Sequence, residues 1–247
     1  MLKVANLCLC YPNGKQALRD IDLEVQPGEL VIVLGGNGSG KTTLLRCIAR
    51  TLAPSSGQVW VDGNDLTRLS GEPLRRARMA LAMISQHASL VRRRSVVANV
   101  ASGALGHYGD WWTALGGLPA KELAVAKAYL DEVGLADLAR QRAGTLSGGQ
   151  AQRVAIARAL AQRPRALLAD EPVASLDPEA AEDIMCLLKR LAKADNLAVL
   201  CVLHQVDLAY SHADRVVGIR DGRVAFDLPK GELSRDAVRG LYLSEAA

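Results

Sequence analysis

The chain has few aromatic residues and no long hydrophobic run. Aromatic side chains make up 4% of its 247 residues, which argues against a surface that binds nucleic-acid bases by stacking. The longest apolar runs extend over five to seven residues, whereas a helix that spans a bilayer needs about 20. No signal-peptide pattern opens the sequence. We therefore expect a cytosolic protein that reaches a membrane only through a partner.

Cysteine content and net charge exclude further classes of protein. The cysteines are odd in number and lack the spacing of zinc ligands; they are Cys8, Cys10, Cys47, Cys186 and Cys201. Free, buried thiols in a reducing compartment are expected, and the pair at positions 8 and 10 is expected to pack from one face of a strand. The net charge is only +4, so nothing requires binding to nucleic acid.

The length suits one compound domain, since 247 residues can bury a full core and the motifs are not duplicated. We expect a parallel-stranded core with a β subdomain from residues 1–87 and 161–247, its β-rich part at 1–30 and 57–65. Residues 88–160 are predicted to form a mostly helical insertion. This insertion is predicted to contain an amphipathic stripe formed by Leu123, Ala126, Leu130 and Val133, and glycine-rich turns at Gly116-Gly117 and Gly134. No further domain is expected after Gly231.

A glycine-rich loop lies between an apolar run and a helical run. Residues 30–34 are all apolar and rich in β-branched side chains, as in a strand buried on both faces. The loop that follows fits the phosphate-binding pattern G-x-x-x-x-G-K-[ST] in Gly35-Gly36-Asn37-Gly38-Ser39-Gly40-Lys41-Thr42. Its backbone N–H groups and the positive end of the next helix suit phosphate oxygens. We expect Lys41 to reach the β- and γ-phosphates of a nucleoside triphosphate and Thr42 to bind Mg²⁺.

Two further segments have the chemistry of a nucleotide site. The first is Leu146-Ser147-Gly148-Gly149-Gln150, where Ser147 is expected to be the N-cap residue of a helical run that ends by Pro164. Such a start is also an anion-binding helix terminus. An apolar strand after Arg165 ends in Asp170 and Glu171. Adjacent carboxylates are costly there unless a cation or a proton-transfer role justifies them, so Asp170 is expected to hold Mg²⁺, directly or through water.

The order and spacing of these motifs resemble those of the ATP-binding subunit of an ABC transporter over nearly the whole chain. The resemblance implies an α/β fold, namely a P-loop NTPase (RecA-like) core with an antiparallel β subdomain and an inserted α-helical subdomain. It implies that residues 146–150 of one subunit close over ATP held by the phosphate loop of another. The working unit is then a dimer, and Glu171 is the general base that polarises the attacking water.

The resemblance also gives roles to residues that carry little information alone. His204, after an apolar strand at 197–203, contacts the γ-phosphate and orients Glu171 and water. Gln86, at the end of a strand predicted at 79–84, touches Mg²⁺ or water and links ATP to the permease. Tyr11 stacks on adenine.

Asp177 has two compatible interpretations. Followed by Pro178, it suits the N-cap of a helix whose first residue is proline. The resemblance places residues 173–177 in a loop that crosses the dimer interface. The predicted ATP-binding residues are Tyr11, Gly35, Gly36, Asn37, Gly38, Ser39, Gly40, Lys41, Thr42, Thr43, Ser147, Gly148, Gly149, Gln150 and Asp177. The predicted catalytic residues are Lys41, Gln86, Glu171 and His204, and the predicted Mg²⁺ ligands are Thr42, Gln86 and Asp170.

Several stretches resemble the phosphonate-importer branch of the family. They are Ala174-Ser175-Leu176-Asp177, Leu203-His204-Gln205-Val206-Asp207, Leu44-Leu45-Arg46-Cys47-Ile48, and Asn99-Val100 with Gly103-Ala104-Leu105-Gly106 and the tryptophans Trp111 and Trp112. The branch also includes importers of phosphite. The resemblance implies import of phosphonates or related phosphorus oxyanions, with a second copy of the chain, membrane permease subunits and, indirectly, a periplasmic or extracellular solute-binding protein as partners.

Alternatives remain open. Another oxyanion or polar-solute importer uses the same ATPase, and so does a soluble ABC ATPase that moves no cargo. The basic run Arg92-Arg93-Arg94 is solvated surface or a docking point for acidic permease loops or anionic lipid. Trp111 and Trp112 are interpreted as packing within the insertion. A peripheral position on the cytoplasmic face of the inner membrane follows from the resemblance.

Overall fold

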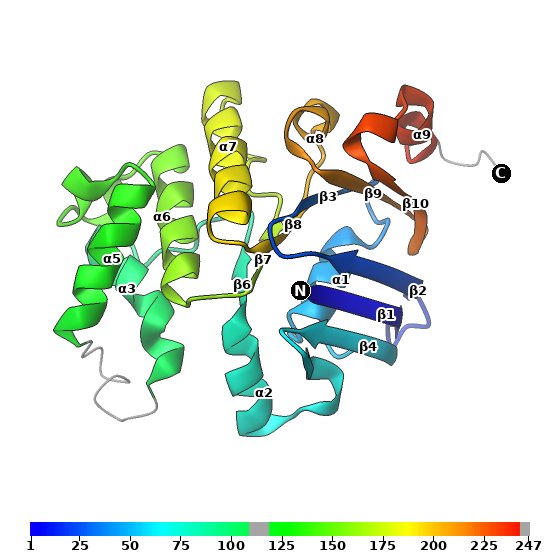
Figure 1. The fold of residues 1–247 in the computed structure, drawn as a ribbon, viewed down its shortest axis with the longest axis horizontal. Coiled ribbons are helices and arrows are strands. Elements are labelled where there is room, and N and C mark those ends of the chain that lie inside the picture. Colours follow the sequence, from blue (N-terminus) through cyan, green and yellow to red (C-terminus); the bar gives the residue numbers. More distant parts are fainter. Residues whose placement is uncertain (109–118, 243–247) are drawn as a thin grey trace.

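Two sheets organise the chain (Figure 1). A computed structural model describes residues 1–108 and 119–242. The four-stranded sheet is antiparallel, in the order β2 (Gln16–Val25), β1 (Leu2–Cys10), β4 (Ser56–Val61) and β5 (Asn64–Asp65). The six-stranded sheet is parallel except for its edge strand β10, in the order β10 (Arg223–Pro229), β9 (Arg215–Arg220), β3 (Leu30–Leu34), β8 (Ala198–Val202), β7 (Ala166–Asp170) and β6 (Leu81–Ile84).

Helices cover both faces of the six-stranded sheet. On one face lies α1 (Lys41–Ile48), between this sheet and the antiparallel one, and on the other lie α7 (Pro178–Ala194) and α8 (Val206–His212). A separate helical group, on the left in Figure 1, consists of α3 (Val96–Ala101), α5 (Ala120–Glu132) and α6 (Gly148–Ala161). The described residues also form the helices α2 (Gly71–Ala77) and α9 (Arg235–Gly240), with 3₁₀ turns at Leu66–Arg68, Arg78–Ala80, Ser102–His107, Ala136–Leu138, Ala143–Thr145 and Lys230–Glu232.

The central strands are buried on both faces because each face has its own core. In β3 the side chains of Leu30, Ile32 and Leu34 pack toward α7 and α8, whereas Val31 and Val33 pack toward α1 and the antiparallel sheet. This alternation is the period of two of a strand. All five residues are 0% exposed, and burying one such side chain is worth about 1.5–3 kcal/mol. The β3 strand is therefore a rigid support for the loop that follows it.

The predicted fold class is confirmed, with local corrections. The strand predicted at 79–84 begins at Leu81, because residues 78–80 form a 3₁₀ turn. In α5 the residues Ala126 and Leu130 are buried as expected, but Leu123 is 37% exposed. Its expected place is taken by Glu122, which is 1% exposed.

Glu122 is tolerated in the core because its carboxylate is satisfied. Its oxygens accept hydrogen bonds from the Tyr108 hydroxyl at 2.7 Å and from Arg163 at 2.9 and 3.0 Å. Burial alone raises the pKa of Glu122, but these bonds outweigh it and hold the pKa below its usual value. Apolar periodicity could not indicate this position, because the partners come from segments distant in sequence.

The cysteines are free, as predicted, but the expectation that they are buried is wrong for three of them. Cys47 and Cys201 are buried, and burial raises the pKa of Cys47 to about 11. Cys10 and Cys186 are exposed and Cys8 is half-buried, so the Cys8–Cys10 pair faces outward rather than packing. In β1 the residues Leu7 and Leu9 face the core instead, because Asn6, with φ of 48°, starts an irregularity in the strand.

In residues 1–108 and 119–242 no helix has both the length and the apolar character to cross a bilayer. The positions Trp111, Trp112 and Gly116-Gly117 lie outside the described residues. The turn predicted at Gly134 is present, with φ of 72° just after α5.

Candidate active site

The carboxyl ends of three neighbouring parallel strands form the site. The phosphate loop follows β3, His204 follows β8, and Glu171 follows β7. Because β3, β8 and β7 are adjacent and parallel, the segments after them meet at one edge of the sheet, where ligands of open α/β sheets bind. Gln86 follows β6, the far edge strand, and so starts at a greater distance from the loop.

The phosphate loop has glycine where the backbone needs it. Gly40 has φ of 111°, and a Cβ there would lie 2.7 Å from the carbonyl oxygen of Ala17, so no larger residue fits without a shift. Gly40 is also the N-cap residue of α1, and no side chain of the described residues caps that helix. In contrast, the Ser147 and Asp177 side chains cap α6 and α7. The first N–H groups of α1 are thus available to an anion.

Lys41 begins α1 and is 5% exposed. Its ammonium donates hydrogen bonds to the carbonyl oxygens of Gly35 at 2.7 Å and Gly36 at 3.0 Å, so it lies within the loop. Burial lowers the pKa of Lys41, and the charges of Glu171 and Asp170 oppose that shift. A buried ammonium held by neutral carbonyls suits an anionic ligand such as a phosphate.

Asp170 and Thr42 meet across the gap between β7 and α1. The alternation of β7 directs Leu168 toward α1, and Asp170, two residues later, follows it. The Thr42 hydroxyl donates a hydrogen bond to Asp170 Oδ1 at 3.2 Å. Burial raises the pKa of Asp170, and the neighbouring Glu171 charge adds to the rise, although the Thr42 bond opposes it. Both groups offer oxygen ligands, the type that Mg²⁺ prefers.

Glu171 is held in an uncommon backbone conformation. Its φ is 51°, in the left-handed region that non-glycine residues rarely adopt. Its N–H donates to the carbonyl oxygen of Val202 at 3.1 Å, and its Oε1 lies 2.6 Å from His204 Nε2. This backbone conformation directs the Glu171 side chain away from the path of β7 and toward His204. The pair has the arrangement of a base and an orienting group.

Residues of the phosphate loop, Glu171 and His204 line one cavity of about 290 Å³. All its lining residues are Tyr11, Lys15, Ala17, Asn37, Gly38, Ser39, Gly40, Lys41, Thr42, Thr43, Glu171 and His204. The Tyr11 hydroxyl lies 3.3 Å from the Thr43 hydroxyl, which places the predicted adenine-stacking ring at the rim. The sequence interpretation missed Lys15 and Ala17; the turn from Tyr11, whose N–H donates to the Lys15 carbonyl, could have indicated them.

The donor set fits a triphosphate. Besides Lys41 and the N–H groups of α1, the Ser39 hydroxyl is buried and has no hydrogen-bond partner among residues 1–108 and 119–242. An orphaned buried hydroxyl is costly unless a ligand satisfies it.

Other predicted site residues lie outside this cavity. Gln86 is exposed and two residues beyond the end of β6. Ser147 accepts a hydrogen bond from Gln150 N at 3.3 Å, while Gln150 Oε1 accepts one from Ser147 N at 3.0 Å. This capping box confirms the predicted N-cap. Asp177 accepts from Ala180 N at 2.9 Å, as predicted for its capping role.

The starts of α6 and α7 lie together. A Cβ on Gly148 would approach Leu176, and one on Gly149 would approach Ala180, each at 3.3 Å. The Ser147 and Asp177 segments therefore form one surface that takes no part in the cavity of the same chain.

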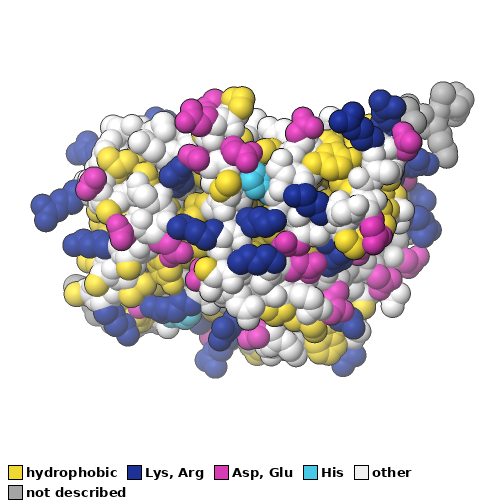
Figure 2. Space-filling view, turned by 45° about the horizontal axis from the view of Figure 1, so that its top comes forward, with side chains coloured by type: hydrophobic (Ala, Val, Ile, Leu, Met, Phe, Trp, Pro, Cys, Tyr) yellow, Lys and Arg dark blue, Asp and Glu magenta, His cyan; other side chains and the backbone are white. Residues whose placement is uncertain are grey.

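A larger groove of about 1080 Å³ lies between α8 and α9. Figure 2 shows hydrophobic side chains in this region next to basic ones. Its lining residues are Val206, Asp207, Tyr210, Ser211, Arg235, Val238, Arg239 and Tyr242. The lining lacks the glycine-rich loop and the Glu171–His204 pair of the smaller cavity, so we place the chemistry in the smaller one.

Curated relatives resemble the chain over almost its full length. A phosphonates import ATP-binding protein of Thiobacillus denitrificans is 47% identical over 235 residues, 95% of this chain and 90% of the relative. One from Halalkalibacterium halodurans is 42% identical over 242 residues, 98% of this chain and 94% of the relative.

Solved structures agree. A dimeric ATP-binding cassette in a post-hydrolysis state with ADP and Pi has a TM-score of 0.81 and 31% identity, covering 93% of this chain and 99% of that one. A subunit from Clostridium perfringens, part of the ABC transporter complex cbiONQ, has a TM-score of 0.82 and 31% identity, covering 94% and 89%. The family model for ABC transporters matches residues 18–174. The chain therefore belongs to the ABC transporter family, as one of its ATP-binding subunits.

Proposed function

We propose that this chain is the ATP-hydrolysing subunit of an importer of phosphonates or related phosphorus oxyanions such as phosphite. The observation that carries the ATPase assignment is the convergence of Lys41, Thr42 and the Glu171–His204 pair at one cavity, with Asp170 hydrogen-bonded to Thr42. The names of the relatives at 42% and 47% identity support the cargo. The cargo does not enter this subunit, so the residues of the active site do not indicate what the cargo is.

Each side chain has a task in hydrolysis. Lys41 and the N–H groups of α1 hold the β- and γ-phosphates, and Tyr11 stacks on the adenine. Glu171 accepts a proton from the water whose oxygen attacks the γ-phosphorus, while the bond from that phosphorus to the bridging oxygen of ADP breaks. His204 keeps the Glu171 carboxylate directed at that water and donates to the γ-phosphate.

Mg²⁺ fits the oxygen donors at the end of β7. Thr42 Oγ1 and Asp170 Oδ1 are 3.2 Å apart, close to the roughly 2.9 Å between neighbouring ligands of an octahedral Mg²⁺ with 2.0–2.1 Å bonds. When bound, the ion neutralises phosphate charge. Gln86 joins it, or its water, only after the segment that carries Gln86 moves toward the cavity.

The active assembly is a dimer of two copies of this chain. Ser147 and Gly149 at the start of α6, and Asp177 at the start of α7, complete the site of the other copy. Their position on one surface, separate from the phosphate loop of the same chain, supports this arrangement. Closure of the dimer on ATP drives the permease, and hydrolysis resets it.

The chain associates with the cytoplasmic face of the membrane through permease subunits, which a solute-binding protein supplies with cargo. The exposed run Arg92-Arg93-Arg94 follows Gln86 by a few residues and is a candidate contact for acidic permease loops or anionic lipid. Replacing all three arginines with alanine should lower permease-stimulated hydrolysis and leave basal hydrolysis unchanged. Equal stimulation of variant and wild type would leave the run as solvated surface.

The test of the ATPase mechanism is the variant Glu171→Gln. With saturating MgATP it should bind ATP, fail to hydrolyse it and accumulate as a closed dimer, detected by light scattering after size exclusion. Wild type under the same conditions should turn over and return to monomer. A variant that stays monomeric would count against the composite site.

The test of cargo is growth of a host that lacks this chain. Phosphonate, phosphite and phosphate each serve as sole phosphorus source, with complementation by wild type or Glu171→Gln. Loss of growth on phosphonate or phosphite, rescued only by wild type, supports the proposal and selects the cargo. Normal growth on every source, with ATPase activity intact, points to another importer or to a soluble ATPase.

A further inference from the structure

Three side chains with metal-binding atoms meet between α7 and α8, outside the nucleotide cavity. Glu182 and Cys186 lie four residues apart on α7, and His212 is the last residue of α8. One carboxylate oxygen, the thiol sulfur and one imidazole nitrogen all lie within 4.8 Å of one another. Residues at i and i+4 share a helix face, so α7 alone holds two of the three groups together.

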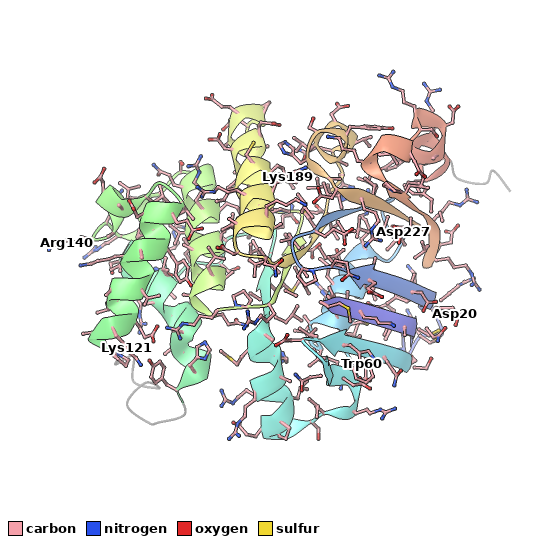
Figure 3. The ribbon with its side chains drawn as sticks, viewed as in Figure 1. Asp20, Trp60, Lys121, Arg140, Lys189 and Asp227 are labelled. Atoms are coloured by element: carbon pink, nitrogen blue, oxygen red, sulfur yellow. The ribbon has the colours of Figure 1, made fainter. Side chains whose placement is uncertain are left out.

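The imidazole is the buried member of this cluster. The His212 side chain is 8% exposed, and its Nε2 lies 2.8 Å from Glu182 Oε1. Its backbone carbonyl accepts a hydrogen bond from Lys189 Nζ at 2.7 Å. Lys189, labelled in Figure 3, extends from the side of α7 that faces α8. The ring is therefore buried, with Nε2 directed at the exposed Glu182 carboxylate and one ring nitrogen within 4.8 Å of the Cys186 sulfur.

Nearby lysines do not compete for the carboxylate. Lys193 Nζ lies 3.1 Å from Asp214, and Lys189 Nζ lies 3.6 Å from it, so both engage another acid. Within residues 1–108 and 119–242, the ion pair recorded for Glu182 is the one with His212. The carboxylate, which is 52% exposed, is therefore open to a cation from solvent.

We propose that Glu182, Cys186 and His212 bind one zinc ion, with a water as fourth ligand. Thiolate, imidazole and carboxylate together are a zinc ligand set, whereas Mg²⁺ and Ca²⁺ prefer oxygen alone. Bonds of about 2.0–2.3 Å in a tetrahedron set the ligand atoms roughly 3.3–3.6 Å apart, so these atoms need to move by about 1 Å. Zinc binds the lone pair of a neutral imidazole nitrogen, so a proton on Nε2 moves to Nδ1, and it binds sulfur as thiolate, so binding releases the thiol proton.

The ion joins two helices that follow loops of the active site. Helix α7 begins directly after Asp177, and α8 begins two residues after His204. Zinc fixes the distance between these helices and stabilises the folded chain by mass action. The proposed zinc site rests on the contacts among Glu182, Cys186 and His212, and it depends neither on the identity of the cargo nor on ATP hydrolysis.

The experiment is a titration of the nucleotide-free, full-length protein with Co²⁺, which reports thiolate ligation by a charge-transfer absorption band. We expect one equivalent to give this band and Zn²⁺ to displace it. Cys186→Ser should abolish the band. Glu182→Gln and His212→Gln should weaken Zn²⁺ binding, measured by chelator competition, by at least the roughly 10–100-fold that loss of an outer partner costs.

The matched control is Cys10→Ser, which removes another exposed thiol and should change neither the band nor the affinity. Zn²⁺ should also raise the melting temperature of wild type and not that of Cys186→Ser. The proposal is overturned by the lack of a thiolate band, by a band that persists in Cys186→Ser, or by equal affinity in wild type and Glu182→Gln. Because Cys186 and Glu182 are exposed, these two variants decide the matter even where His212→Gln folds poorly.

Discussion

The two carboxylates at the end of β7 are neighbours in sequence with different surroundings. Asp170 follows the strand alternation toward α1 and loses water contact there, which raises its pKa. Glu171 turns away through a positive φ and meets His204. The first is thus placed to bind a cation and the second to handle a proton.

Removing the Asp170 charge should stabilise the protein without metal. Its pKa is higher in the folded than in the unfolded chain, so the folded state binds more protons between these two values. The free energy of unfolding therefore falls as pH rises through that window. At neutral pH, Asp170→Asn should therefore raise the melting temperature in scanning calorimetry, by roughly 2–4 °C for each 1 kcal/mol gained in the free energy of unfolding. MgATP should stabilise wild type more than this variant, and a lower melting temperature without metal would contradict the argument.

Replacing Lys41 should separate ligand binding from folding. Lys41→Met keeps the length of the buried side chain and removes its charge, so the melting temperature should not fall. Loss of a hydrogen bond to a charged group, about 1.5–3 kcal/mol, should weaken ATP binding about 10–100-fold, measured with a fluorescent ATP analogue. Lys15→Met, on the rim of the same cavity, is the control and should have the smaller effect. Unchanged affinity in Lys41→Met would refute the role of its ammonium.

At the scale of elements, helix α6 holds the segment that carries Gln86. Arg158 donates to the carbonyl oxygens of Ala88 at 2.7 Å and Ser89 at 2.9 Å, and Gln152 donates to that of Ser85 at 3.4 Å. Both donors lie on α6, the helix that begins at the predicted ATP-closing motif. We therefore expect a displacement of α6 to move the segment that carries Gln86.

Arg158→Ala should loosen this segment. The lost charge-assisted bonds should lower the free energy of unfolding by about 1.5–3 kcal/mol, measured by denaturant titration. Hydrogen exchange should rise in residues 85–91 more than in the central strands. Arg140→Ala is the control, since Arg140 is exposed on the outer side of the helical group (Figure 3) and should change neither quantity. Unaltered exchange in residues 85–91 of Arg158→Ala would contradict the anchoring role.

At the scale of the whole molecule, the phosphate cavity and the start of α6 lie on separate surfaces, which agrees with the proposed site shared between two copies. The phosphate cavity contains no residue of the α6 start, and the α6 start lies against the α7 start instead. In the proposed symmetric dimer, the α6 start of each copy faces the phosphate cavity of the other copy.

Mixing two inactive variants should restore activity. The Lys41→Met variant lacks the ammonium group in the phosphate loop, and the Ser147→Arg variant has the start of α6 blocked. Each homodimer therefore has two defective sites. A heterodimer has one site with both halves intact. Equal mixing with random pairing should therefore recover roughly a quarter of wild-type sites, measured as phosphate release. A mixture no more active than the sum of its components would rule out sites shared between copies.

Local patterns in the sequence determined the chemistry of the site, because each depends on short spacing. The apolar run and glycine-rich loop predicted β3 and α1, and the caps at Ser147 and Asp177 follow from hydrogen bonds within three residues. The motif order sufficed to identify the family.

Only the tertiary structure decided what depends on distant segments. It placed Glu122 rather than Leu123 in the core, because Tyr108 and Arg163 satisfy its charge. It turned Cys186 outward toward His212, 26 positions later in the chain, and it left Gln86 outside the cavity because β6 is an edge strand. Periodicity indicates which face of an element is apolar, but the partners that stabilise a buried charge or assemble a ligand set are set by the packing of elements far apart in sequence.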